Sequence, residues 1–456
     1  MIDSLLLRVL PEQVPTRDEN VYVDTVFELY RLASNQVPSA EQDQLLAFLS
    51  MRVEIAGRLF CAYGPEGKKI ADDPVETQWS EVALGVFFCD FLRLSEMSGH
   101  ESVAFKRLNA IFKLVDSIHS IGSKREVFTD LREAIDIQSA LFLNRYSVGV
   151  ASESARLTFP SAVASEQKVL PITVLFWEGP IARAYLAAIK SMGYRPERII
   201  HLISALDLVS KKPVGRYLPS FLRDGYAQGV QKNSIHYWAS ELLKKEPELC
   251  VAIRSSVAQS LFFDSEVLEN ALALSDLRGY CPNVETLMIN DLADDRLYNY
   301  LAVLPETNLL FTGGGIVPAR SLQLAHLKFI HVHPGYLPDV RGADGVLWSQ
   351  LIKGRTSASC FYMAPGIDDG DVIFPCYLPT VKIIYDPSTV HLKMLYRALY
   401  AFFDPWVRAY ALREAISATE GLNFKKVFEQ DESLSTTYHF MHEKLQKVSL
   451  SEFFID

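Results

Sequence analysis

The sequence lacks several features that would place the protein in a specialised class. Its six cysteines are scattered and form no CxxC pair, which argues against a disulfide framework or a zinc cluster and favours reduced thiols. No run of about eighteen uncharged apolar residues is present, so we expect no membrane span. Residues 1–11 carry Asp3 and no basic start, unlike a signal peptide. These absences predict a soluble cytoplasmic protein.

Blocks of lysine and arginine are also missing. The chain holds 45 Lys and Arg against 55 Asp and Glu, a net charge of −10, without a basic cluster. The electrostatic footprint of a nucleic-acid binder is therefore absent. We expect no polynucleotide and no membrane among the partners, whereas a charged small molecule is compatible with this balance.

The length of 456 residues predicts two or three domains rather than a single core. In the first third, apolar residues recur at three- and four-residue spacing, for example over 41–60 and 105–115. This spacing predicts an all-α N-terminal domain over residues 1–160. A stretch rich in Ser and Ala, residues 152–168, is a candidate linker.

Residues 170–385 show a different pattern, in which β-branched and aromatic runs alternate with helical stretches. Such alternation predicts βαβ units and an α/β domain with a parallel sheet covered by helices. A helical stretch over 204–283 interrupts it as an insertion, and the amphipathic pattern after 385 predicts a mainly helical C-terminal extension over 386–456. The predicted strands are 170–177, 198–203, 284–289, 308–312 and one that starts at Leu327.

The most informative segment follows the strand that starts at Leu327. It contains His331-Val-His333-Pro-Gly-Tyr-Leu-Pro, then Arg-Gly, and later Asp368 within Ile-Asp-Asp-Gly-Asp. A strand that ends here puts both imidazoles at the carboxyl edge of the sheet, where open α/β sheets bind ligands. An imidazole backed by a carboxylate is the minimum equipment for proton transfer. The alternatives are a structural histidine in a Pro-Gly turn and a turn-forming role for Asp368.

Three consecutive glycines, Gly313, Gly314 and Gly315, follow another predicted strand and precede a helix. Such a turn exposes backbone N–H groups and tolerates the close approach of a ligand, which makes it a candidate cofactor-binding turn. A plain tight turn would explain the same residues. The motif is neither GxGxxG nor a P-loop, so a dinucleotide is not indicated.

In combination, these motifs resemble the catalytic domain of the folate-dependent formyltransferases, which include glycinamide ribonucleotide, methionyl-tRNA and sugar-amine formyltransferases. The resemblance rests on the GG turn, the HPGxLP loop, Arg-Gly and an I-D-x-G-D motif whose first aspartate stands 35 positions after His333. It covers roughly residues 170–385 without the insertion. It implies a Rossmann-like fold and formyl transfer from 10-formyltetrahydrofolate, as the formyl donor, to a small amine acceptor, without a metal.

The resemblance also implies roles for individual residues. His333 takes the position of the general acid or base, and Asp368 the position of the carboxylate that orients it. Where the family has an asparagine that stabilises the oxyanion, this chain has His331, which donates a hydrogen bond best when protonated. Tyr336 and Leu337 fall in the folate-binding loop, with Tyr336 a candidate wall for the pterin ring. Arg341 is a candidate partner for the acceptor or the folate glutamate, or a loop anchor.

Three functions are compatible with these motifs. The first is a formyltransferase, the second a formyltetrahydrofolate hydrolase that uses water, and the third a catalytically silent member that acts as a binding protein. Retention of His333 and Asp368 favours the first two, while the unusual His331 favours the third. The sequence specifies neither the acceptor nor the oligomeric state, and a homo-oligomer is compatible with it.

Overall fold

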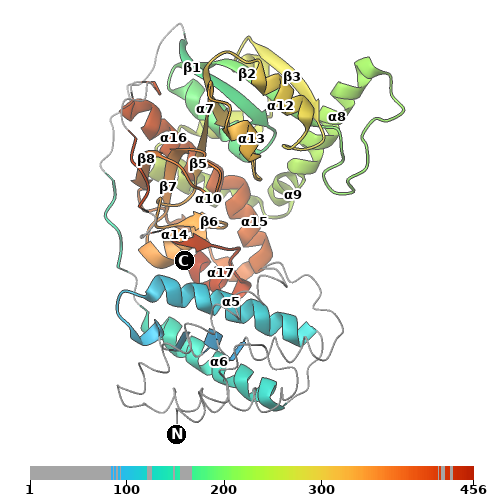
Figure 1. The fold of residues 1–456 in the computed structure, drawn as a ribbon. Helices are drawn as coiled ribbons and strands as arrows, with labels where there is room; N and C mark the ends of the chain where they lie inside the picture. Colours follow the sequence, from blue (N-terminus) through green and yellow to red (C-terminus); the bar gives the residue numbers. More distant parts are fainter. Residues whose placement is uncertain are drawn as a thin grey trace. The chain divides into compact units, whose positions relative to one another are not determined.

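The structure is a computed structural model (Figure 1). It describes residues 84–120 apart from 86, 89, 90 and 93, and residues 126–146, 149–154, 167–419, 421–422, 427–431 and 435–455. The chain divides into two compact units, one formed by residues 1–148 with 439–445 and the other by 149–438 with 446–456. The helical stripe predicted over 41–60 lies outside the described residues.

The described part of the first unit contains helices α5 (Glu101–Ser120) and α6 (Glu126–Arg145). Phe142 of α6 meets Phe105 of α5 edge to face, with ring centroids 4.9 Å apart. The backbone N–H of His442 donates to Asn109 Oδ1 over 2.7 Å, which ties the segment 439–445 to α5. α5 buries the stripe predicted for it, namely Phe105, Leu108, Ile111, Phe112 and Val115. The extent of an all-α domain over 1–160 stays a prediction.

The second unit is built on a seven-stranded sheet. The five strands of this sheet that come first in the sequence are parallel to one another. β5 (Leu327–His333) pairs in an antiparallel manner with β7 (Ser357–Tyr362), and β7 with β8 (Val372–Tyr377). The parallel strands agree with the predicted α/β architecture. In spatial order the strands are β3 (Val284–Ile289), β2 (Tyr194–Ser204), β1 (Lys168–Trp177), β4 (Thr307–Phe311), β5 (Leu327–His333), β7 (Ser357–Tyr362) and β8 (Val372–Tyr377).

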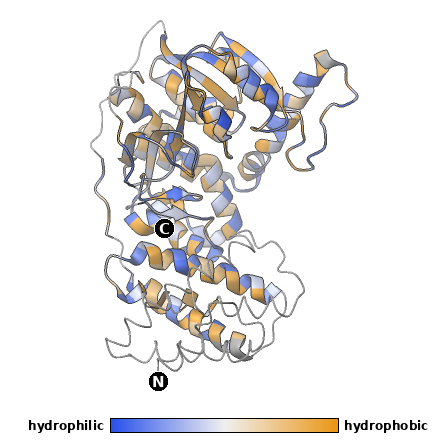
Figure 2. Ribbon diagram, in the orientation of Figure 1, coloured by the Kyte–Doolittle hydropathy of each residue, from blue (hydrophilic) through white to orange (hydrophobic). Residues whose placement is uncertain are grey.

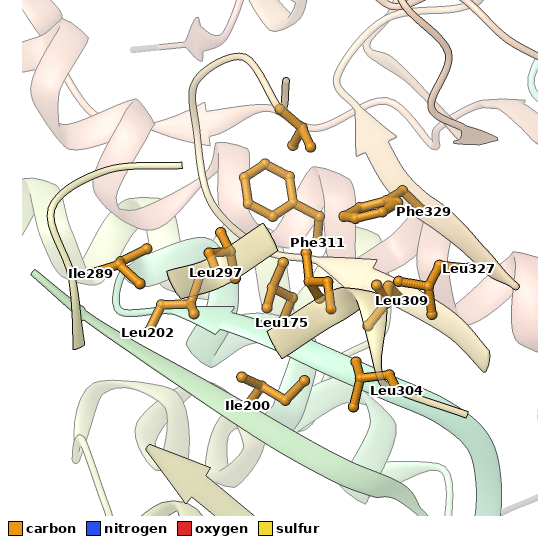
Figure 3. Close-up of a cluster of buried hydrophobic side chains, with 12 residues drawn as sticks. Leu175, Ile200, Leu202, Ile289, Leu297, Leu304, Leu309, Phe311, Leu327 and Phe329 are labelled. Atoms are coloured by element: carbon orange, nitrogen blue, oxygen red, sulfur yellow. The ribbon is translucent and has the colours of Figure 1, made fainter. Parts of the chain in front are cut away.

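Connections between the strands place helices against the sheet. α7 (Pro180–Ser191) begins with Pro180, whose fixed φ suits a first helical position, and Gly193, with φ of 78°, follows its end. α12 (Asp295–Ala302) and the short α13 (Ala319–Leu322) follow β3 and β4. Figure 3 shows Leu175, Phe311 and Phe329 of the strands gathered with Leu297 of α12 in one apolar cluster. Burial of each such side chain contributes about 1.5–3 kcal/mol.

The predicted insertion between β2 and β3 is helical, as expected. Its helices are α8 (Ser220–Ile235), α9 (Tyr237–Lys245), α10 (Pro247–Leu261) and α11 (Ser265–Leu272). The ribbon coloured by hydropathy shows hydrophilic and hydrophobic residues mixed along α8 (Figure 2).

The amphipathic pattern of residues 388–416 divides into two helices, α15 (Leu392–Phe402) and α16 (Asp404–Ala418). The break falls just before Pro405, which has no N–H for a continuous helix and suits the first turn of a new one. α16 packs against α7 and β7, so it covers one face of the sheet.

The remaining C-terminal extension contains short strands besides α17 (Glu443–Ser451). β10 (Thr437–Tyr438) pairs with β6 (Arg341–Gly342), and β11 (Phe454–Ile455) pairs with β9 (Ile383–Ile384). Helical periodicity could not reveal these strands, because two-residue pairings carry no periodic signal. In the part of the chain that the structure describes, no helix combines the length and the apolar character needed to cross a membrane.

Candidate active site

Strand β5 delivers both motif histidines to its carboxyl end. Since His331 and His333 are two residues apart on a strand, their side chains leave the same face of the sheet. The strand lies between parallel β4 and antiparallel β7, where His333 is opposite Ser359. The loop that follows then turns back over this face, because the Ser359 hydroxyl donates to Gly335 O and accepts from the Leu337 N–H.

His333 is buried and both of its ring nitrogens have partners. Nδ1 lies 3.2 Å from Asp368 Oδ2, and Nε2 lies 2.9 Å from the carbonyl oxygen of Val340. The side chain of His333 is only 3% exposed. Carboxylates and carbonyls both accept hydrogen bonds, so the ring satisfies the two partners when each nitrogen carries a proton. The predicted pairing of His333 with Asp368 is present in the structure.

Asp368 is held as an anion at the start of a tight turn. Its backbone has φ of 50°, which is uncommon for a residue other than glycine. Oδ2 accepts a 2.7 Å hydrogen bond from the Gly342 N–H in addition to its contact with His333. Burial alone would raise the pKa of Asp368, but the charge and hydrogen bond of His333 and the Gly342 N–H outweigh it. The pKa of Asp368 therefore lies well below its ordinary value.

Glycines allow the surrounding loops to approach the His333 ring closely. A Cβ on Gly335 would stand 2.5 Å from Val340 O and 2.7 Å from His333 Nε2. On Gly345, which begins α14 (Gly345–Lys353), it would stand 2.2 Å from Pro334 O. Both positions require a residue without a side chain because backbone atoms fill the space. The local Gly-Pro content of this motif is therefore part of the site geometry.

His331 lies between two aromatic rings, with centroid distances of 5.9 Å to Phe311 and 6.0 Å to Phe361. Its Nδ1 is 3.3 Å from the carbonyl oxygen of Phe311, which fixes the proton on Nδ1 and leaves Nε2 as an acceptor. Burial lowers the pKa of His331 to about 4, and the positive charge of Arg408 adds to this, against the opposing charge of Asp368. The ring is therefore neutral at neutral pH and is not in the protonated form that donates best to an oxyanion.

This environment predicts a pH-dependent stability. The pKa of His331 is about 4 in the folded protein and 6.5 for an ordinary histidine, so its contribution is complete above pH 6.5 and is lost as the pH falls toward 4. The loss reaches at most about 3 kcal/mol, since one pKa unit corresponds to about 1.4 kcal/mol. The melting temperature of His331→Asn should fall less than that of the wild type between pH 7 and 4. Parallel curves for the two proteins would refute this assignment.

Arg408 of α16 contacts the backbone at the end of β5, and this residue was not identified from the sequence. It donates from Nη1 to the carbonyl oxygen of Val332 over 2.9 Å and from Nε to Asp404 Oδ2 over 2.9 Å. The carbonyl it binds lies between the two motif histidines. α16 carries several charged residues among its apolar ones, and a charged residue in a buried helix needs a buried partner, but this pattern does not single out Arg408.

The candidate folate residues have different surroundings. Tyr336 is stacked on Tyr377 with ring centroids 4.4 Å apart and an interplanar angle of 9°. Leu337 is buried in a cluster with Phe361 and Val372. Arg341 donates from Nε and Nη2 to Gln430 Oε1, over 3.1 and 2.8 Å, and has Asp369 at 3.9 Å. The structure thus gives Arg341 the partners of a loop anchor.

Two residues near the motif have partners within the structure. Asp344 accepts hydrogen bonds from the hydroxyls of Tyr396 and Tyr400 over 2.8 and 2.7 Å. Trp348 is fully buried and stacks with Tyr438 at 4.6 Å. Asp344 is itself buried, and its carboxylate is engaged by the two hydroxyls.

The glycine turn after β4 borders a cavity. The strand order reverses between β1 and β4, and ligands of open α/β sheets bind in the crevice beside such a reversal. The cavity has a volume of about 210 Å³ and includes Trp177 at the end of β1 and Gly314 after β4. Asp207, Asn290 and Asp291 contribute polar groups to its lining. In the described ranges, no cluster of three or more His, Cys, Asp or Glu side chains suits a metal ion.

Comparison with known proteins agrees with the resemblance seen in the motifs. No family model matches the chain. A segment of 73 residues is 37% identical to methionyl-tRNA formyltransferase of Syntrophus aciditrophicus; the match covers 16% of this chain and 23% of that protein. A segment of 71 residues is 35% identical to methionyl-tRNA formyltransferase of Clostridioides difficile; this match covers 15% of this chain and 23% of that protein. The chain thus spans less than a quarter of the length of these curated relatives.

The solved structures that the comparison matches include a sugar N-formyltransferase from a Shewanella species. It has a TM-score of 0.32 and 10% sequence identity, and the match covers 63% of this chain and 87% of that one. A 4-N formyltransferase from Francisella tularensis has a TM-score of 0.30 and 12% identity over 60% and 76% of the two chains. The sequence matches support a relation of this chain to the formyltransferases, a family of enzymes.

Proposed function

We propose that the chain transfers a formyl group from 10-formyltetrahydrofolate to a small amine. The observation that carries this proposal is the buried pair of His333 and Asp368 at the carboxyl end of β5, with the spacing of the family motif. The donor supplies a formyl carbon that an amine nitrogen attacks to form a tetrahedral intermediate. The bond from that carbon to the folate nitrogen then breaks, so the amine nitrogen must lose one proton and the folate nitrogen must gain one.

In this proposal His333 supplies the proton to the leaving nitrogen. Asp368 keeps the ring oriented, because its Oδ2 lies 3.2 Å from Nδ1. Nε2 now donates to Val340 O, so a substrate that uses this proton has to displace that carbonyl.

We assign His331 a role different from that of the family asparagine. As a neutral ring that donates from Nδ1 to Phe311 O, it presents Nε2 as an acceptor. An acceptor at this position suits an N–H of the attacking amine better than an oxyanion. The stacked pair of Tyr336 and Tyr377 offers an aromatic wall for the pterin ring.

The function is tested by incubating the protein with 10-formyltetrahydrofolate, with and without a panel of small amines, and following the release of tetrahydrofolate. We expect release that depends on an amine, because the cavity beside the reversal of strand order has room for an acceptor. Equal release without amine would instead identify a hydrolase. Absence of release, together with absence of folate binding by calorimetry, would contradict both enzymatic functions and favour a silent member.

A further inference from the structure

The C-terminal extension reaches back to both loops that surround His333. Phe428 and Val372 exchange two backbone hydrogen bonds of 2.8 Å, beside the Asp368 turn. Thr437 and Tyr438 form strand β10 on β6, beside the loop that carries Val340. We call residues 427–431 and 435–438 the strap. Its described residues therefore flank the site on two sides.

Gln430 of the strap contacts both loops with one side chain. Its amide oxygen accepts hydrogen bonds from Arg341 Nε and Nη2, over 3.1 and 2.8 Å. Its amide nitrogen donates to the carbonyl oxygens of Asp368 and Gly370, over 3.1 and 2.6 Å. This orientation of the amide is consistent with its chemistry, because its oxygen accepts from the Arg341 guanidinium and its nitrogen donates to two carbonyl oxygens.

These contacts act on the two partners of the catalytic imidazole. Asp368 faces His333 Nδ1, and its backbone stays in the left-handed region only if the surrounding structure holds it there. Val340, which faces Nε2, directly precedes Arg341. Gln430 joins the turn of Asp368 to Arg341, so its four hydrogen bonds fix the spacing between the two acceptors that hold the ring.

We propose that Gln430 is a positioning residue, through which the strap holds the Asp368 turn and the Val340 loop at the distance that orients His333. The catalytic consequence rests on the proposed formyl transfer, while the effect on the two loops does not. A residue of this kind affects the reacting geometry without contacting substrate, and small displacements of a catalytic group can cost about 100-fold in rate.

The test compares Gln430→Met and Gln430→Glu with the wild type. Gln430→Met removes all four hydrogen bonds at similar length, whereas Gln430→Glu keeps an acceptor for Arg341 and loses the two donated bonds to Asp368 and Gly370. Both variants should lower kcat by about 10- to 100-fold with the KM for the formyl donor within twofold. Gln323→Met, at an exposed position after α13, is the matched control and should be unchanged.

A second measurement does not depend on any activity. The Gly342 N–H donates to Asp368 Oδ2, so peptides covering 338–345 should exchange amide hydrogens faster in Gln430→Met than in the wild type. If the wild type shows no formyl transfer and exchange is still faster in Gln430→Met, the proposed function is refuted while the positioning role of Gln430 stands. Unchanged kcat with unchanged exchange in Gln430→Met would overturn that role, as would a full rescue of kcat by Gln430→Glu.

Discussion

His333→Ala is expected to lower kcat by about 10²- to 10⁴-fold, the range typical of a lost general acid or base. The structure adds an effect on stability, because the imidazole is buried against an ionised carboxylate. Without the ring, Asp368 keeps the Gly342 N–H but loses the cation that holds its pKa low. Removal of one partner of a buried ion pair costs about 3–5 kcal/mol, and partial exposure of Asp368 makes this an upper limit.

A double variant separates the two effects. In His333→Ala with Asp368→Asn, the buried anion is gone, so the melting temperature should recover part of its loss while kcat stays low. His326→Ala is the matched control, since His326 also bonds a backbone carbonyl, that of Leu301, and directly precedes β5 at the end opposite His333. Recovery of activity in the double variant, or an unchanged kcat in His333→Ala, would show that the histidine is structural.

Gly335→Ala should be nearly as damaging as the loss of His333, although it adds only one methyl group. The methyl would overlap both atoms of the hydrogen bond between His333 Nε2 and Val340 O, at 2.7 and 2.5 Å. Overpacking of this kind typically costs about 1–3 kcal/mol, and we expect at least about a 100-fold loss of kcat from the displaced ring. Thermal unfolding and steady-state kinetics on the same preparation measure the two quantities.

The control for this substitution is Gly225→Ala in the middle of α8, where an added Cβ meets no atom within 4 Å. It should stabilise the protein by about 0.5–1 kcal/mol, because alanine is the better helix former. Its kcat should not change. If Gly335→Ala, like this control, loses neither stability nor kcat, the loop after β5 accommodates the methyl group and the tight packing around His333 is not needed for activity.

The sequence was sufficient for the features that depend on local pattern. The bounds of β3 agree with the run of residues 284–289, and those of β4 agree with the run of residues 308–312 to within one residue. The pairing of His333 with Asp368 was also predicted, because the spacing of the family motif carries it. Local periodicity and a recognised motif were enough for these features.

Other features depend on contacts between residues that are distant in the chain. Nothing near residue 430 indicates that a glutamine there bonds Arg341, and the short pairing of β10 with β6 has no periodic signature. The state of His331 depended on burial and on Arg408 of α16, 77 residues further along the chain. A sequence motif gives the residue type at a position, but not the burial, charges and hydrogen bonds around the side chain that set its pKa.

The pairing of the strap with the site also has a consequence for the order of events during synthesis. The ribosome releases the end of β5 about a hundred residues, and Asp368 70 residues, before Tyr438. Because chains fold from the N-terminus as they emerge, the sheet of the second unit can form while the two loops around His333 are still without the strap. The proposed activity should therefore appear late in translation, after the fold that carries it.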